Sequence, residues 1–108
     1  MTEKKETPEI ETEQKQGDDN VVFIGEKPFM NYVNSVNMQF VEKGQNEVII
    51  KARGRFTARA IDVAEVIRKK FLKTENIKIK DIKIDSEDFE NKEGKRVSVS
   101  IIEITLSK

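Results

Sequence analysis

The sequence predicts an α/β two-layer sandwich, in which a four-stranded mixed sheet carries two helices on one face and a hairpin protrudes from the sheet. Two observations predict this class. Apolar residues recur every three or four positions in residues 27–43 and 57–73, which is typical of helices. In the last third of the chain they recur every two positions, which is typical of strands. The expected order is therefore β-α-β-α-β-β.

The first strand and the first helix are expected between residues 20 and 43. Residues 20–25 form a short apolar run that ends at a glycine. Pro28 suits the first turn of a helix, where the missing N–H costs nothing, and Gly44 is a typical C-terminal stop. The apolar stripe of this helix consists of Phe29, Tyr32, Val33, Val36 and Phe40.

The second strand is expected at residues 47–53 and the second helix at residues 57–73. Gly54 breaks the strand, because glycine tolerates backbone conformations that other residues avoid. Thr57 is expected to cap the helix with its hydroxyl. The predicted buried face of the helix consists of Ala60, Ile61, Ala64, Ile67 and either Phe71 or Leu72.

The last two strands form a predicted hairpin with a long polar tip that contains Gly94. The alternation of residues 77–84 changes phase near Lys80 and Asp81, which indicates a β-bulge. The alternation of the final strand also changes phase, after Ile101.

A chain of 108 residues supports one domain. Its formal net charge is zero, but the charge is unevenly distributed. Residues 1–20 carry seven acids against three lysines, whereas residues 51–73 carry eight basic residues against two acids. We expect residues 1–19 to be a disordered acidic tail, since they contain too few apolar residues to offset the entropy of ordering. Residues 20–108 form the predicted domain.

Several classes of function are excluded by composition. The chain contains neither histidine nor cysteine, which removes the usual catalytic triads, thiol nucleophiles and histidine-based metal sites. The glycine-rich nucleotide motifs are also absent. No segment has the roughly 20 apolar residues that span a bilayer. We therefore expect a soluble protein that is no enzyme, binds no cofactor and contacts no membrane.

Positive charge is concentrated where the second strand meets the second helix, at Lys51, Arg53, Arg55 and Arg59. A single arginine at such a place is often only part of a solvated rim. Several guanidinium groups at one edge can instead contact successive phosphates and release condensed counterions. Lys27 would join the same surface if the carboxyl ends of the first two strands are adjacent. The cluster therefore favours a polyanion as ligand.

Two segments closely resemble the Alba family of archaeal chromatin proteins. They are VVFIGEKPFMNYV (residues 21–33) and IIKARGRFTARAIDVAEVIRKKFL (residues 49–72). The similarity continues through IKIKDIKI and SVSIIEITLSK, so that it covers residues 20–108.

The resemblance implies a homodimer that binds double-stranded DNA without sequence specificity, binds RNA as well, and coats, bridges or compacts DNA. It implies a cytoplasmic protein associated with the chromosome. Phe71 lies at the family's apolar contact between neighbouring dimers along DNA, although a phenylalanine at a helix end is as often a core residue. The implied nucleic-acid-binding residues are Lys27, Tyr32, Lys51, Arg53, Arg55, Arg59, Lys95 and Arg96. Tyr32 also suits a packing role within its helical stripe.

The chain departs from the family at Glu26, where many members have the first of two lysines. That lysine is the family's acetylation site, so Lys27 is the remaining candidate for modification, with a deacetylase as the implied partner. The predicted hairpin is also acidic. Its acids are Glu87, Asp88, Glu90 and Glu93. Together with the tail they predict weaker or more salt-sensitive DNA binding, because like charges repel phosphate.

Two alternatives to a chromatin protein stay open. One is an RNA-binding protein or ribonucleoprotein subunit with weak DNA binding, although few aromatic residues are available for stacking on unpaired bases. The other is a scaffold protein whose acidic hairpin meets a basic partner.

Overall fold

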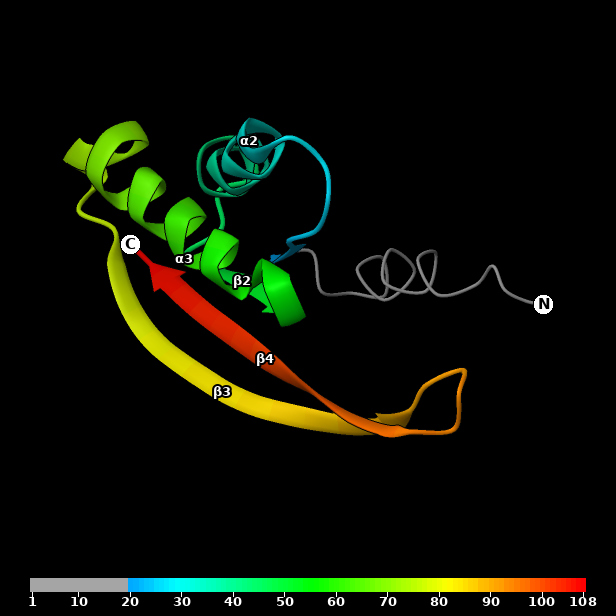
Figure 1. Cartoon of the computed structure of the whole chain (residues 1–108). Helices are drawn as coiled ribbons and strands as arrows, with labels where there is room; N and C mark the ends of the chain where they lie inside the picture. The colour runs from blue at the N-terminus through cyan, green and yellow to red at the C-terminus, as the bar shows by residue number, and fades with distance from the viewer. Residues whose placement is uncertain (1–19) are drawn as a thin grey trace.

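The computed structural model describes residues 20–108 and contains the sheet and the helices that the sequence predicts. The strands are β1 (Val21–Phe23), β2 (Glu47–Arg53), β3 (Lys78–Glu90) and β4 (Arg96–Ser107), in the spatial order β1-β2-β4-β3. Helices α2 (Phe29–Val41) and α3 (Thr57–Val66) cover one face of this sheet (Figure 1). The predicted α/β sandwich is confirmed. The tail predicted at residues 1–19 lies outside the described residues.

The sheet is mixed, because β1 and β2 run parallel while β2, β4 and β3 pair antiparallel. Phe23 at the end of β1 pairs with Lys51 of β2. The N–H of Ile24 then donates a hydrogen bond of 2.8 Å to the Lys51 carbonyl oxygen. The carboxyl ends of these two strands therefore lie side by side, as the position of Lys27 on the basic surface requires.

Helix α2 is shorter than predicted. Pro28 occupies its N-cap with an extended ψ of 144°, so the helix begins at Phe29 instead of residue 27. Its C-terminal stop is close to the predicted glycine, since Gly44 has a φ of +65°, in the left-handed region that favours glycine. The buried face consists of Tyr32, Val33, Val36 and Phe40, all members of the predicted stripe.

Helix α3 starts differently from the prediction. The hydroxyl of Thr57 was expected to cap the helix, but it donates a hydrogen bond of 3.0 Å to the Gly54 carbonyl oxygen. That carbonyl belongs to a 3₁₀ turn, Gly54–Phe56, which precedes the helix. The prediction of a Thr57 cap is wrong, because the Thr57 hydroxyl bonds to the Gly54 carbonyl oxygen, which also accepts the Thr57 N–H, and the N-cap position belongs to Phe56.

The end of α3 also differs from the prediction. α-Helical bonding stops at Val66, and a π-helical turn, Ile67–Phe71, replaces the regular helix expected to residue 73. The N–H of Leu72 donates to the Ile67 carbonyl oxygen five residues back, at 2.8 Å. Leu72 is buried, whereas Phe71 is 43% exposed.

The prediction for one residue of the buried face of α3 is wrong. Ile61 is 47% exposed, and Val63 is fully buried in its place. Ala60, Ala64 and Ile67 are buried as predicted. The narrow helix face that meets β2 and β4 runs through Ala60, Val63 and Ala64, so Ile61 lies at its edge.

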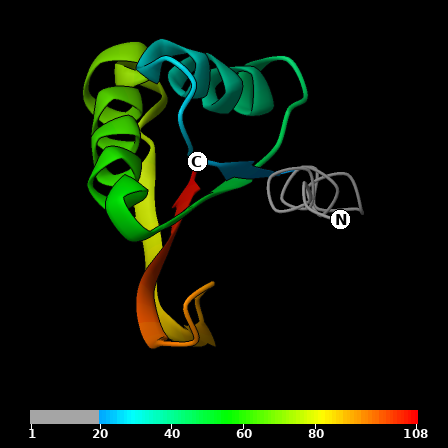
Figure 2. The same cartoon turned by 45° about the vertical axis from the view of Figure 1, so that its right-hand side comes forward.

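The predicted bulge in β3 is confirmed by a register shift between Ile79 and Asp81. Because of this shift, Ile79, Ile82 and Ile84 all pair with residues on the helix-covered face of the sheet. The hairpin of β3 and β4 extends well beyond the helices (Figure 2). The predicted phase change in β4 is also present. Up to Ile101 the apolar residues point to the face of the sheet that the helices leave open, and from Ile102 onward they point into the core.

The core lies between the sheet and the two helices. Its largest fully buried side chains are Phe40, Ile50, Ile67 and Leu106. Within residues 20–108, neither helix has the length and apolar character needed to cross a bilayer.

Candidate nucleic-acid interface

Two segments meet at the adjacent carboxyl ends of β1 and β2. One is the loop of residues 25–27 after β1, and the other is residues 53–59, which contain Gly54 and the start of α3. We call these two segments together the basic junction. Gly54 has a φ of +62°, which confirms the expectation that glycine is needed there. The sharp turn places Arg53 and Arg55 on either side of it.

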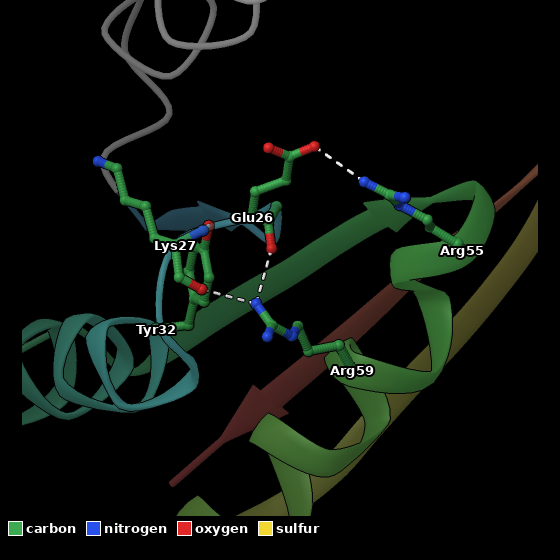
Figure 3. A network of polar contacts seen from close by, with 6 residues as sticks. Glu26, Lys27, Tyr32, Arg55 and Arg59 are labelled. Atoms are coloured by element: carbon green, nitrogen blue, oxygen red, sulfur yellow. Dashed lines mark hydrogen bonds and ion pairs between the residues drawn. The ribbon is translucent and has the colours of Figure 1, made fainter.

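Arg59 joins the two segments of the basic junction. One nitrogen of its guanidinium, Nη1, donates to the Gly25 carbonyl oxygen at 2.9 Å and to the Lys27 carbonyl oxygen at 2.6 Å (Figure 3). The side chain thereby spans from the first turn of α3 to the loop after β1. These two bonds make Arg59 a brace that fixes the loop.

Tyr32 supports the same loop from beneath. Its side chain is only 7% exposed, and its hydroxyl oxygen accepts a hydrogen bond of 2.9 Å from the Lys27 N–H. A side chain at Gly25 would place its Cβ 3.3 Å from this hydroxyl, which explains the glycine. The structure therefore places Tyr32 in the core, with its hydroxyl orienting the loop.

Arg53 and Arg55 each face a carboxylate. A guanidinium nitrogen of Arg55 lies 2.8 Å from an oxygen of Glu26, and one of Arg53 lies 3.0 Å from an oxygen of Glu87 on β3. The guanidinium of Arg55 also stacks over the Phe56 ring, 4.8 Å from its centroid. Both arginines remain accessible to solvent.

Lys51 projects from the face of the sheet that the helices leave open. Its ammonium lies 3.4 Å from Glu103 of β4 and 5.4 Å from the centroid of the Phe23 ring. Both Lys51 and Glu103 are half-buried. Lys51 is thus near the basic junction, but its ammonium group is held against the open face of the sheet by Glu103 and Phe23.

Lys95 and Arg96 lie at the far end of the hairpin. Arg96 pairs with Asp88 across the two strands at 3.8 Å. In the turn, the Asn91 side-chain oxygen accepts hydrogen bonds from the N–H groups of Glu93 and Lys95. The hairpin therefore carries its two basic residues as a separate arm.

The structure brings Lys27, Arg53, Arg55 and Arg59 together, and it separates Phe71 from them. Phe71 lies beyond the C-terminal end of α3, whereas the basic junction lies at the N-terminal end. Within residues 20–108 the ammonium groups of Lys27 and Lys95 form no ion pair. The described residues contain no group of acids that could hold a metal ion.

The carboxylates that pair with the two arginines were not predicted from the sequence. Glu26 was interpreted only as a departure from the family pattern, and Glu87 only as one of several hairpin acids. A signal for Glu26 existed, since the parallel pairing that was expected to bring Lys27 to the arginines also brings the residue before it. No comparable sequence signal pairs Glu87 with Arg53.

The sequence profile of the Alba family matches residues 20–86. A DNA/RNA-binding protein Alba 1 from Archaeoglobus fulgidus is 51% identical over 90 residues, which are 83% of this chain and 97% of the relative. A DNA/RNA-binding protein Alba from Nanoarchaeum equitans is 54% identical over 88 residues, 81% of this chain and 96% of the relative. The names of these relatives describe nucleic-acid binding and no enzymatic activity.

Solved structures give the same result. The structure of Alba from Thermoplasma volcanium superposes with a TM-score of 0.73 at 45% identity, and the match covers 82% of this chain and all of the other. From its sequence, its fold and these relatives, this chain belongs to the Alba family.

Proposed function

We propose that this protein binds double-stranded DNA without sequence preference, coats, bridges or compacts it as a chromatin protein, and also binds RNA. The observation that carries this proposal is the basic junction, where Lys27, Arg53 and Arg55 project into solvent from adjacent strand ends. Its support from outside the chain is that close relatives are named DNA/RNA-binding proteins. Such a protein would act in the cytoplasm, on the chromosome.

Phosphate is the ligand that suits this surface. A guanidinium group offers a planar fork of donors that matches two phosphate oxygens, and Arg53 and Arg55 present two such groups around one glycine. Contacts with the phosphate backbone carry no sequence information, so the binding would be insensitive to sequence. Lys51 and Arg59 would add charge behind them. The hairpin would carry Lys95 and Arg96 toward the minor groove.

We further propose that the protein is a homodimer. Three isoleucines of β3, Ile79, Ile82 and Ile84, are 39%, 52% and 79% exposed, although they pair with core residues of β4. Ile61 lies about 200° around α3 from Arg59. Because Arg59 points to the β1 side, Ile61 points toward β3, where the helical layer ends. These four exposed isoleucines therefore lie toward the β3 side of the molecule, where a second copy of the chain would bury them.

The dimer is tested by substituting Ile82 and Ile84 together with lysine. We expect the variant to elute as a monomer with its circular dichroism spectrum retained, because both side chains are exposed in the single chain. Light scattering after size exclusion gives the mass. Lysine in place of the exposed Met38 on α2 is the matched control and should leave a dimer. A wild-type protein that is monomeric at micromolar concentration would contradict the proposal.

Two residues receive further roles within this proposal. Phe71 is 43% exposed on the π-helical turn, and it would contact a neighbouring dimer along DNA in a higher assembly. Lys27 is exposed and directly follows Glu26, so it is the candidate for acetylation and for reversal by a deacetylase.

The second candidate function is an RNA-binding protein or ribonucleoprotein subunit with weak DNA binding. It is favoured by the carboxylates that face Arg53 and Arg55, which would weaken attraction to a duplex more than to single-stranded RNA, whose charge density is lower. Measuring affinity for duplex DNA, duplex RNA and single-stranded RNA of matched length distinguishes the two functions. The chromatin function predicts that duplex DNA binds at least as tightly as either RNA. A preference of tenfold or more for RNA would favour the second function.

A further inference from the structure

We infer that Glu26 and Glu87 set the strength of nucleic-acid binding by holding Arg55 and Arg53 in direct competition with phosphate. This inference rests on the proposed function and adds two acidic residues to the binding surface. Binding would then be an exchange, in which a phosphate replaces a carboxylate on each arginine.

The loop that carries Glu26 is held in place by several contacts. Arg59 binds the carbonyl oxygens of the residues on either side of Glu26, and Tyr32 accepts a hydrogen bond from the Lys27 N–H (Figure 3). Glu26 therefore projects from a fixed backbone toward Arg55 and reaches it at 2.8 Å. The side chains of this pair are 73% and 77% exposed, so a phosphate can approach the guanidinium from solvent.

Glu87 reaches the junction from a different part of the fold. It pairs in register with Val99 of β4, and its carboxylate lies 3.0 Å from the guanidinium of Arg53. Gly54 also approaches Val99, since a Cβ on this glycine would lie 3.7 Å from a Val99 methyl group. The base of the hairpin therefore sits against the turn, and it presents Glu87 to the arginine that precedes Gly54.

The two pairs have the same arrangement on the two sides of one glycine. Each arginine flanking Gly54 faces one carboxylate, and the carboxylates come from the β1–α2 loop and from β3. Exposed pairs of this kind are weak, so they do not block binding. They lower the affinity for nucleic acid, because each ion pair must be broken before the guanidinium can form two hydrogen bonds with a phosphate.

The exchange also changes how binding depends on salt. A basic residue that neutralises a phosphate releases condensed cations, which gives a steep salt dependence. When the basic residue first leaves a carboxylate, that carboxylate attracts cations again, and the net release is smaller. Removing the carboxylate should therefore tighten binding most at low salt and should make the dependence on salt steeper.

The test uses the full chain with Glu26→Gln, Glu87→Gln and both together, titrated against one duplex DNA at several salt concentrations. Glutamine keeps the size and polarity of the side chain and removes the charge. We expect about two- to fivefold tighter binding at low salt for each substitution, from the usual strength of exposed pairs. The log–log salt slope should steepen by up to about one unit for each exchanged arginine.

Two matched controls separate pairing from general repulsion. Asp62 is exposed on α3 and forms no ion pair within residues 20–108. Glu75 lies beyond α3, at the opposite end of the sheet from Gly54. Both Asp62→Asn and Glu75→Gln remove one negative charge and should change affinity by less than about twofold. In addition, Glu26→Gln should have no effect once Arg55 is replaced by glutamine, because its partner is gone.

The outcomes are distinguishable. Tighter binding for the two paired acids alone, and loss of the Glu26 effect without Arg55, would support the inference. A second outcome is that the wild type binds DNA while Glu26→Gln and Glu87→Gln bind it no more tightly than the wild type does. In that case the inference fails and the proposed function stands. An equal gain for Asp62→Asn would mean that general charge repulsion, and not ion pairing, weakens binding, and it would also overturn the inference. Absence of nucleic-acid binding by every variant, even at low salt, would overturn the proposed function itself.

Discussion

Replacing Arg53 and Arg55 together with alanine is expected to weaken binding to duplex DNA about a hundredfold at low salt. Hydrogen bonds to charged groups contribute about 1.5–3 kcal/mol each, and 1.4 kcal/mol corresponds to a factor of ten. The loss of each arginine also leaves Glu26 or Glu87 without its partner and facing the phosphates. Fluorescence anisotropy with a labelled duplex gives the change.

The loss should be the same for unrelated DNA sequences, because contacts with the backbone are indifferent to the bases. Replacing Lys43 and Lys78 with alanine is the matched control. Both lysines are exposed and form no ion pair within residues 20–108, and they lie away from Gly54. This control should weaken binding less than threefold. A loss for the arginine variant that is confined to one sequence would contradict backbone recognition.

Replacing Arg59 with alanine is expected to affect stability more than any other change at the basic junction. Its Nη1 serves the carbonyl oxygens of Gly25 and Lys27, and both would lose this donor. We expect a loss of about 2 kcal/mol in the free energy of unfolding, which corresponds to a Tm lower by about 10 °C in a domain of this size. Thermal unfolding followed by circular dichroism measures it.

Arg59→Lys separates the two roles of this residue. Lysine keeps the positive charge, but its single ammonium on a flexible stem is a poor substitute for the guanidinium between two carbonyls. The brace therefore predicts a lower Tm for both variants, with affinity for DNA reduced less by lysine than by alanine. An Arg59→Ala protein that unfolds like the wild type but binds DNA weakly would show that Arg59 is a phosphate ligand alone.

The sequence was informative where a local pattern has one physical meaning. The helical stripe of α2, the bulge at Lys80 and Asp81, and the strand break at Gly54 were all predicted and are confirmed. In each case the cause is apolar spacing or a backbone constraint within a few residues, so it can be recognised in the local sequence.

The errors arise where a neighbouring turn or the packing against the sheet overrides the local pattern. The hydroxyl of Thr57 is a good cap in isolation, but a neighbouring 3₁₀ turn offers it a carbonyl instead. The π-helical turn after Val66 allows Leu72 to reach the core, and no local periodicity encodes the extra residue. Ile61 was assigned to the core because apolar spacing cannot distinguish a residue that packs against the sheet from one that lies at its edge.

The basic residues of the candidate site were predicted, but their ion pairs with carboxylates were not. The basic residues and their adjacency followed from the parallel order of β1 and β2. Their ion pairs depend on side chains far apart in the sequence, such as Glu26 and Arg55, which are 29 residues apart. The bonds of Arg59 could not be predicted for a similar reason. Their acceptors are backbone carbonyl oxygens, which every residue has, so the sequence does not distinguish them.

The proposed function requires the basic junction to bind the phosphate backbone. The most direct test is the affinity of the wild-type protein for two unrelated DNA duplexes, measured across a range of salt concentrations. If a dimer contacts about six to eight phosphates, log affinity should fall linearly with log salt, on the same line for both duplexes. Full counterion release would give a slope of about −5 to −7, and the exchange at Arg53 and Arg55 makes the wild-type slope shallower by up to about one unit for each exchanged arginine. A slope near zero, or affinities that differ more than about tenfold between the duplexes, would contradict the claim.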